Sequence, residues 1–318
     1  MAVIGIDLGG TKIAAALFDQ NGTVMARKTE LLAGRTGDQV GDLINDVIAS
    51  FRMAYLTEII QGIGVCVPGI VYSRTDRVWA PNIPGWEDYP LKAKIMAGLD
   101  GVKLPVSIES DRTCYILGEV WQGAARGCEN AIYLAVGTGI GAGILLDGRV
   151  IHGANDIVGA TGWMALEHPY QEEFVPVGCF EYYASGNGIG TNARRLLMQQ
   201  GDYAGVLRNK PIEAITSHDV FDAYASGDLL ATQVLDKAVQ MWGMGTANLV
   251  SLFNPEKIIF GGGVFGPAVG LIDRIYQEAC RWGQPISIKQ VEFCASKVGG
   301  DAALLGAAYL ILRSLRRV

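Results

Sequence analysis

Two glycine-rich turns contain the residue types that could bind phosphate groups. The first turn is Gly9-Gly10-Thr11-Lys12, and the second is Gly137-Thr138-Gly139. Glycine lets the backbone approach an anion closely and adopt positive φ, so consecutive N–H groups can converge on phosphate oxygens. Each turn adds a threonine hydroxyl, and Lys12 adds a positive charge. The pattern predicts two phosphate-binding turns, although the same glycines could simply shape hairpins.

Two other phosphate-binding motifs fit the sequence poorly. A P-loop requires a Gly-Lys dipeptide, and the chain contains none. The second turn matches a loose dinucleotide-binding pattern, G-x-G-x-x-A, at residues 137–142. That fingerprint has to open a helix, whereas the residues after Gly139 read as a strand and reach an Asp-Gly turn at 147–148. A nicotinamide-dependent oxidoreductase is therefore the weaker interpretation.

Asp111 is the residue best suited to proton transfer. It follows a predicted strand at 106–109 and begins a predicted helix at 111–122. A hydroxyl group is a poor nucleophile, so a carboxylate has to orient it and accept its proton as a new P–O bond forms. The residue pattern therefore indicates a general base for phosphoryl transfer. The alternative is that Ser110 and Asp111 only cap the helix, which both residue types do well.

The elements that must position these residues repeat along the chain. Each glycine turn lies within a set of three strand patterns, at 3–7, 13–18 and 23–28 for the first turn and at 131–136, 141–146 and 149–151 for the second. Each set is followed by a helical pattern and a buried strand pattern, at 38–53, 63–67, 229–253 and 258–260. Alternating strands and helices indicate an α/β fold. The repeat predicts two related domains.

The composition narrows the class of protein. A chain of 318 residues is long enough for two domains, and 50% of the residues are hydrophobic. The net charge of -6 argues against a nucleic-acid binder, which would need a basic face. The six cysteines form no C-x-x-C pair, which favours a reduced, intracellular protein. We find no signal peptide and no apolar run of membrane-spanning length, so we expect a cytoplasmic protein without membrane contact.

These motifs together resemble the ROK family of sugar kinases and repressors, within the actin-like and hexokinase-like ATPase superfamily. The resemblance covers nearly the whole chain. Its motifs are IGIDLGGTK at 4–12, VPG at 67–69, APNIPGW at 80–86, SD at 110–111, GTGIG at 137–141, NP at 254–255, GGG at 261–263 and GDAALLGAA at 300–308. So many motifs in one order make the resemblance specific.

The resemblance implies two actin-like (ribonuclease H-like) domains around a central cleft, with ATP between them. The N-terminal domain would comprise residues 1–112, completed by a C-terminal helix at about 301–318, and the larger C-terminal domain would comprise residues 113–300. A homodimer is also implied. ROK repressors carry an additional N-terminal DNA-binding region, for which this chain has no room before its first turn, so we expect the kinase branch.

The resemblance also implies roles for individual residues. Asp7 resembles the carboxylate that holds the Mg²⁺ shell through water, and Asp111 resembles the catalytic base. The implied ATP-binding residues are Asp7, Gly9, Gly10, Thr11, Lys12, Gly137, Thr138, Gly139, Gly261, Gly262 and Gly263. The implied substrate-binding residues are Gly69, Asn82, Ser110, Asp111, Trp163 and Glu181.

The chain departs from the family pattern around the acceptor. Ser110 replaces the usual Asn before the catalytic Asp, Ala160 replaces a sugar-binding Glu, and Trp163 replaces a His that contacts sugar and orders a zinc site. Cys179 alone remains of the cysteine cluster, and one thiolate cannot make a tetrahedral zinc site, so we expect no structural zinc. Trp163 could stack on a sugar ring or fill space.

These departures predict a changed acceptor rather than ordinary glucose, because lost hydrogen bonds strongly alter discrimination between hydroxylated substrates. Candidates are an unusual hexose, an amino or deoxy sugar, or a C7-cyclitol. A catalytically silent sugar or nucleotide sensor is the alternative from another class. A chaperone or filament of the actin-like superfamily is disfavoured by the short length of the chain.

Overall fold

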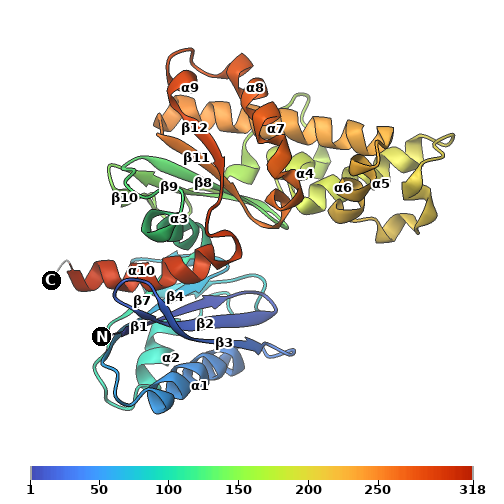
Figure 1. Ribbon diagram of the computed structural model, residues 1–318. Coiled ribbons are helices and arrows are strands. Elements are labelled where there is room, and N and C mark those ends of the chain that lie inside the picture. Colours follow the sequence, from blue (N-terminus) through green and yellow to red (C-terminus); the bar gives the residue numbers. More distant parts are fainter. Residues whose placement is uncertain (1, 317–318) are drawn as a thin grey trace. The chain divides into compact units, whose positions relative to one another are not determined.

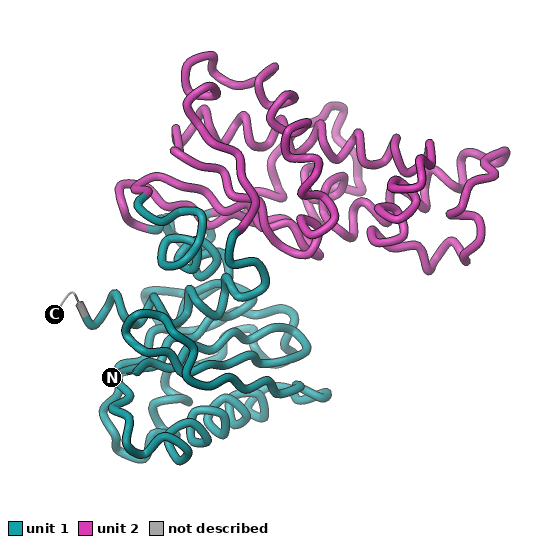
Figure 2. Tube along the Cα trace, viewed as in Figure 1, with its two compact units in different colours: residues 1–127, 150–158, 297–318 teal, residues 128–149, 159–296 magenta. Residues whose placement is uncertain are grey.

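The computed structural model describes residues 2–316, and the chain divides into two compact units (Figure 2). Unit 1 comprises residues 1–127, 150–158 and 297–318, and unit 2 comprises residues 128–149 and 159–296. The whole of the helix that begins at Asp111 lies in unit 1. The contact-based boundary at residue 127 and the expected domain boundary at residue 112 therefore differ by about the length of that helix.

Unit 1 is built on a five-stranded sheet with the strand order β3-β2-β1-β4-β7. The strands are β1 (Ala2–Leu8), β2 (Lys12–Asp19), β3 (Val24–Leu31), β4 (Ile60–Val67) and β7 (Val106–Ser110). The first three form an antiparallel meander, and β1, β4 and β7 run parallel. Because parallel strands end at the same edge of a sheet, the residues after β1, β4 and β7 lie at one edge of unit 1.

Helices cover both faces of this sheet (Figure 1). One face packs on α1 (Asp38–Ala54) and α2 (Leu91–Ala97), and the other packs on α3 (Asp111–Gln122) and α10 (Ala302–Arg316). The alternation of β1 explains this arrangement, because Ile4 joins the core beneath α1 and Val3 joins the core beneath α10. A small hairpin of β5 (Ile70–Tyr72) and β6 (Arg77–Trp79) is added to unit 1.

The C-terminal helix α10 packs directly against the N-terminal sheet. It contacts both β1 and β4, although these elements lie at opposite ends of the sequence. A Cβ atom added to Gly64 would lie 1.8 Å from the carbonyl oxygen of Ala307. The chain therefore needs glycine at this position of β4, since any side chain would push α10 off the sheet.

Unit 2 repeats the sheet of unit 1, with the strand order β10-β9-β8-β11-β12. Its strands are β8 (Ala131–Val136), β9 (Ile140–Leu146), β10 (Arg149–Val150), β11 (Lys257–Gly261) and β12 (Glu292–Ala295). Strands β8 and β9 pair antiparallel, as β1 and β2 do in unit 1, and β8, β11 and β12 run parallel, as β1, β4 and β7 do. The repeated sheet confirms the duplication that the two hairpin patterns predicted.

The helices of unit 2 are more numerous than those of unit 1 among the described residues. They are α4 (Cys179–Ala184), α5 (Gly186–Gln199), α6 (Ser217–Ala225), α7 (Leu229–Phe253), α8 (Ile272–Trp282) and α9 (Ser287–Gln290). The side chain of Asp228 caps the start of α7, and Asn254 ends it in the left-handed conformation before Pro255. The bounds of α3 and α7 agree with the helices predicted at 111–122 and 229–253. Within residues 2–316, no helix is both long enough and apolar enough to cross a bilayer.

Candidate active site

Three carboxylates and one lysine gather near the end of β1 in unit 1. Asp7 is the next-to-last residue of this strand, which pairs with β4. Strand β4 pairs in turn with β7, and Asp111 follows directly after β7. The charges of Asp111 and Asp301 act on Asp7, and so does the opposite charge of Lys12. Burial is the main cause that raises the pKa of Asp7 to about 6, with Asp111 and Asp301 adding to the rise. A hydrogen bond with the Cys66 thiol and the positive charge of Lys12 both lower the pKa of Asp7 and so oppose this shift.

Asp111, the predicted base, and Ser110 make different hydrogen bonds at the start of α3. The Ser110 hydroxyl accepts a hydrogen bond from the Thr113 backbone N–H at 3.3 Å, so Ser110 caps the helix. The Asp111 carboxylate accepts one from the backbone N–H of Arg112 at 2.8 Å. Burial raises the pKa of Asp111, while the Arg112 guanidinium opposes the rise. Since Ser110 supplies the cap, Asp111 is not needed for it.

The first glycine turn connects β1 with β2. The backbone N–H of Gly9 donates to the Lys12 carbonyl at 2.9 Å and closes the turn. Gly10, Thr11 and Lys12 are exposed, so their polar groups are accessible to a ligand. Asn82 lies beside this turn, since a Cβ atom on Gly10 would be 3.5 Å from the Cβ atom of Asn82.

Gly69 has a packing reason to be glycine. A Cβ atom at this position would lie 2.0 Å from the carbonyl oxygen of Trp79, across the small hairpin of β5 and β6. Any larger residue would therefore force these two strands apart. This contact explains the residue type of Gly69 without a ligand, so its place among the substrate-binding residues stays a prediction.

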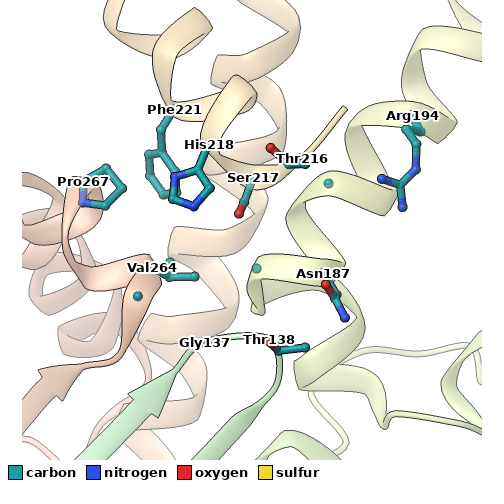
Figure 3. Close-up of a pocket in the computed structure, with 13 residues that line it drawn as sticks. Gly137, Thr138, Asn187, Arg194, Thr216, Ser217, His218, Phe221, Val264 and Pro267 are labelled. Atoms are coloured by element: carbon teal, nitrogen blue, oxygen red, sulfur yellow. The ribbon is translucent and has the colours of Figure 1, made fainter. Parts of the chain in front are cut away.

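The second glycine turn forms one wall of a cavity in unit 2 (Figure 3). The Gly137 N–H donates to the Gly139 carbonyl at 2.9 Å, and the Gly137 carbonyl accepts from the Gly186 N–H at 2.8 Å, which fastens the turn to the start of α5. The cavity measures about 470 Å³. It is lined by Gly137, Thr138, Gly186, Asn187, Gly190, Arg194, Thr216, Ser217, His218, Phe221, Gly263, Val264 and Pro267.

Three of the predicted nucleotide-binding residues of unit 2 line this cavity, namely Gly137, Thr138 and Gly263. Gly263 has open space where a side chain would begin. Gly261 and Gly262 do not line it, and packing explains both: a Cβ atom on Gly261 would lie 1.9 Å from the Tyr133 hydroxyl, and Gly262 has a φ of +87°. Gly139 also lies outside the cavity lining.

Most of the remaining lining comes from α5 and α6, which the sequence patterns did not indicate. In Figure 3, Ser217, His218 and Phe221 stand at the start of α6, and Asn187 stands on α5 near Thr138. A signal was present at α5, where glycines alternate at 186, 188 and 190 around a helix start. Such a start favours close approach of an anion to backbone N–H groups. No comparable pattern marks α6.

Glu181 links the second glycine turn to the segment in which the family's acceptor residues are replaced. Its carboxylate accepts a hydrogen bond from the Ile140 N–H at 2.7 Å. A Cβ atom on Gly162 would lie 2.8 Å from the same Oε2 atom. Burial raises the pKa of Glu181, and the Ile140 hydrogen bond opposes this. The nearby Trp163 side chain is 58% exposed, so it does not fill the interior of unit 2.

A family model decides the relationship of the chain to known proteins. The model described as the ROK family matches residues 3–314. The chain belongs to the ROK family. This ROK protein is 32% identical over 320 residues to a glucokinase of Halalkalibacterium halodurans, a match that covers 97% of this chain and 94% of that protein.

Solved structures of ROK proteins share the fold. The crystal structure of a ROK hexokinase from Thermus thermophilus matches with a TM-score of 0.82 and 27% identity, over 100% of both chains. A ROK family glucokinase from Streptomyces griseus, in complex with glucose and AMPPNP, matches with a TM-score of 0.77 and 28% identity, over 98% of this chain and 99% of that chain. The α/β fold class and the ROK resemblance predicted from the sequence are therefore confirmed.

The ROK zinc motif is reduced to one cysteine in this chain. Cys179 is a buried free thiol at the start of α4. In the part of the chain that the structure describes, no group of three or more His, Cys, Asp and Glu side chains is arranged to hold a metal ion. The expectation that this ROK protein binds no structural zinc stays a prediction, which metal analysis of the purified protein would test.

Proposed function

We propose that this ROK protein is an ATP-dependent kinase that transfers the γ-phosphoryl group of ATP to a hydroxyl of a sugar or sugar-like polyol. The observation that carries the proposal is the placement of Asp111 at the edge of the unit 1 sheet, within the electrostatic reach of Asp7. A carboxylate at a strand end, beside an exposed glycine turn, suits a base that acts on an acceptor hydroxyl. The full-length similarity to a glucokinase supports the same activity.

The cavity of unit 2 would hold the adenosine part of ATP. Its volume of about 470 Å³ falls within the usual range for small-molecule sites, about 300–1,000 Å³. Thr138 and the start of α5 would face the phosphate groups, because helix N-termini favour negative charge. Phe221 and Val264 offer apolar contact to a base. The S. griseus relative was solved in complex with AMPPNP, which supports nucleotide binding by this ROK protein.

A divalent cation, which we propose to be Mg²⁺, fits the surroundings of Asp7. Burial raises the pKa of Asp7, and the like charges of Asp111 and Asp301 add to the rise, so a cation at this point would stabilise the ionised carboxylate and offset the repulsion. Mg²⁺ keeps several waters and needs only one or two protein carboxylates, so the site does not require a larger ligand cluster. When bound, the metal would neutralise charge on the phosphate oxygens.

The chain's own residues would act on the acceptor as follows. Asp111 accepts the proton of the acceptor hydroxyl while the bond from that oxygen to the γ-phosphorus forms and the bond from phosphorus to the ADP oxygen breaks. Lys12 places a positive charge beside the first glycine turn, where phosphate oxygens would approach.

The acceptor that this site favours differs from the one that most ROK sugar kinases use. The Ala160 side chain offers no hydrogen-bonding group, and the exposed Trp163 presents an aromatic surface instead of an imidazole. Glu181 retains the carboxylate that the family has at this position, and its Oε2 atom accepts a hydrogen bond from the Ile140 N–H. We therefore propose an acceptor that offers an apolar ring face and fewer hydroxyl contacts, such as an amino sugar, a deoxy sugar or a C7-cyclitol.

ADP release against a panel of hexoses, N-acetylhexosamines, amino sugars and cyclitols tests the proposal. An acceptor-dependent release identifies the substrate class. The Asp111→Asn variant keeps the shape of the residue and removes the base, so its turnover should fall by about 10²–10⁴-fold. Near-normal turnover of this variant would remove Asp111 from the role. The homodimer stays a prediction, and light scattering of the purified chain measures it.

A further inference from the structure

The segment 150–158 begins with the last residue of β10 and belongs to unit 1 (Figure 2). Within it, the Asp156 carboxylate accepts hydrogen bonds from the N–H and the hydroxyl of Ser73, at 2.9 and 3.1 Å. Asp156 itself has a φ of +60°, a conformation that non-glycine residues seldom adopt, so the Ser73 bonds stabilise an unusual backbone. Earlier in the segment, the Nε2 atom of His152 lies 3.7 Å from Oε1 of Glu109.

The end of this segment is held by the residue that follows the proposed base. The Nη1 atom of Arg112 donates to the carbonyl oxygens of Ile157 at 3.3 Å and Val158 at 3.1 Å. Val158 directly precedes residues 159–163, where the acceptor-binding residues of the family are replaced. Arg112 therefore fixes the point from which this acceptor segment begins.

The electrostatic surroundings of Arg112 point to a second task. Both of these acceptors are neutral carbonyl groups, whereas the charge that acts on the guanidinium is that of Asp111. Burial lowers the pKa of Arg112, and burying a cation against neutral acceptors is unfavourable unless an opposite charge is close. The interaction affects both residues, since the positive charge of Arg112 also opposes the rise in the pKa of Asp111.

We propose that Arg112 is a positioning residue for the phosphoryl transfer: it directly follows Asp111 at the start of α3, and its guanidinium fixes the carbonyl groups of Ile157 and Val158. The inference rests on the proposed kinase function and deepens it. One side chain then sets both the protonation of the base and the start of the acceptor segment. Removal of its charge and removal of its two hydrogen bonds should have separable effects.

The groups that face Asp111 determine how its ionisation responds. Burial disfavours the Asp111 carboxylate, whereas the charge of Arg112 on α3 and the Arg112 backbone N–H favour it. The charge of Asp111 also acts on Asp7 on β1, whose pKa it raises. The thiols of Cys66 on β4 and Cys114 on α3 also face Asp111, and both are buried. Because burial raises the pKa of both thiols, they stay neutral near neutral pH. Arg112 is therefore the group whose loss should raise the pKa of Asp111.

The experiment compares Arg112→Met with Arg112→Lys, using the acceptor identified by the ADP-release panel. The Met variant loses the charge, so the acid limb of kcat against pH should move up by about one pH unit. The Lys variant keeps the charge, so its acid limb should coincide with that of the parent protein. Both variants lose the two-carbonyl contact, and the KM for the acceptor should rise about 5–10-fold in each. Arg126→Met, an exposed arginine of unit 1, is the matched control.

A purely structural role makes a different prediction. Lower thermal stability of the Met variant, with an unchanged pH profile and unchanged acceptor KM of the folded enzyme, would overturn the inference. If the Met variant does not fold, Ser73→Ala and Asp156→Ala remove the hydrogen bonds between these two side chains and loosen the same segment without touching Asp111. Each should raise the acceptor KM and leave the acid limb in place, and an unchanged KM in both would overturn the role of the segment. Full turnover of Asp111→Asn would instead contradict the proposed function.

Discussion

The two units share one sheet but differ at the end of its central strand. In unit 1, Asp7 stands two residues before the glycine turn, whereas in unit 2 the matching position is Ala135. The edge of unit 1 gathers ionisable side chains around Asp7, while the edge of unit 2 opens into a cavity lined mainly by uncharged residues. The duplicated backbone supplies a glycine turn twice. We propose that the side chains around each turn determine its task, proton transfer beside the turn in unit 1 and nucleotide binding in unit 2.

The connections between strands explain the second difference. In unit 1, the single helix α1 joins β3 to β4. In unit 2, the corresponding connection from β10 to β11 contains the segment 150–158 and helices α4 to α7. These additional helices include α5 and α6, which line the cavity. The cavity therefore depends on an insertion that unit 1 lacks.

Removing the charge of Asp7 should have the largest effect on the difference between the two units. Asp7→Asn should lower kcat by at least about 10²-fold, because the proposed metal site loses its carboxylate. The same variant should gain about 1–3 kcal/mol of unfolding free energy at pH 8, since burial makes the ionised form unfavourable. Activity assays and urea unfolding at pH 8 measure the two effects.

The sign of the stability effect follows from the raised pKa of Asp7. The pKa of Asp7 is about 6 in the folded chain and 3.8 when the group is free in water, as in the unfolded chain, so folding favours the protonated form. This contribution is fully present below pH 3.8 and is lost as the pH rises through 6. The gain of the Asn variant should therefore shrink between pH 8 and pH 5. The exposed Asp46→Asn should show neither effect, and equal gains at both pH values would contradict the explanation.

A side chain placed in the unit 2 cavity would sharpen the division between the units. Gly263→Val enters open space and should raise the KM for ATP by about 10–100-fold while leaving the acceptor KM unchanged. Gly270→Val also enters open space in unit 2 but lies outside the cavity lining, so it should behave like the parent protein. Isothermal titration with AMPPNP compares the three proteins, and similar affinities would exclude this cavity as the nucleotide site.

The carboxylate of Glu181 gives a smaller effect. Glu181→Gln retains an oxygen that can accept from the Ile140 N–H, so the second glycine turn should keep its shape. The acceptor KM should rise by about tenfold, because a charged hydrogen-bond partner of the acceptor is lost. Steady-state kinetics with both substrates measure the change, with the exposed Glu173→Gln as control. A selective rise in the KM for ATP would instead assign Glu181 to the nucleotide side.

The smallest effect should come from the ion pair between Arg27 and Asp301. Arg27 donates to both carboxylate oxygens of Asp301, at 2.9 and 2.8 Å, but the side chains are 46% and 43% exposed. Arg27→Gln should therefore cost no more than about 1 kcal/mol of unfolding free energy at moderate salt. Urea unfolding of the single variants and of the double variant with Asp301→Asn isolates the pair. A larger coupling energy would show that Asp301 contributes more to the carboxylate edge than its exposure indicates.

Local patterns were sufficient to predict the duplicated hairpins and the helices α3 and α7. Their residues carry the signal themselves, through strand alternation, Asn-Gly and Asp-Gly turns and helical spacing. The role proposed for Asp111 needed more, because Ser110 and Asp111 are both good capping residues and only the family resemblance favoured a base. The structure then separated the two residues by showing Ser110 in the cap.

The cavity lining and the segment 150–158 could not be predicted in the same way. His218 and Gly263 become neighbours of Thr138 only after the helices of unit 2 pack, and no local pattern records such a meeting. The hydrogen bond from Arg112 to the Val158 carbonyl could not be predicted from the sequence either. Every residue has a carbonyl acceptor, so the residue types give no sign of which carbonyl will be used. Long-range partnerships of this kind require coordinates.

The packing of α10 on β1 and β4 sets the order in which the protein can mature on the ribosome. The face of the sheet that includes Val3 and Phe18 is covered by Leu304, Ala308 and Ile311, which are synthesised after the whole of unit 2. Unit 1 therefore begins to be translated before unit 2 but is completed after it, and its apolar sheet face has no cover until α10 has left the exit tunnel. A premature stop codon before α10 would therefore destabilise the strands that were translated first.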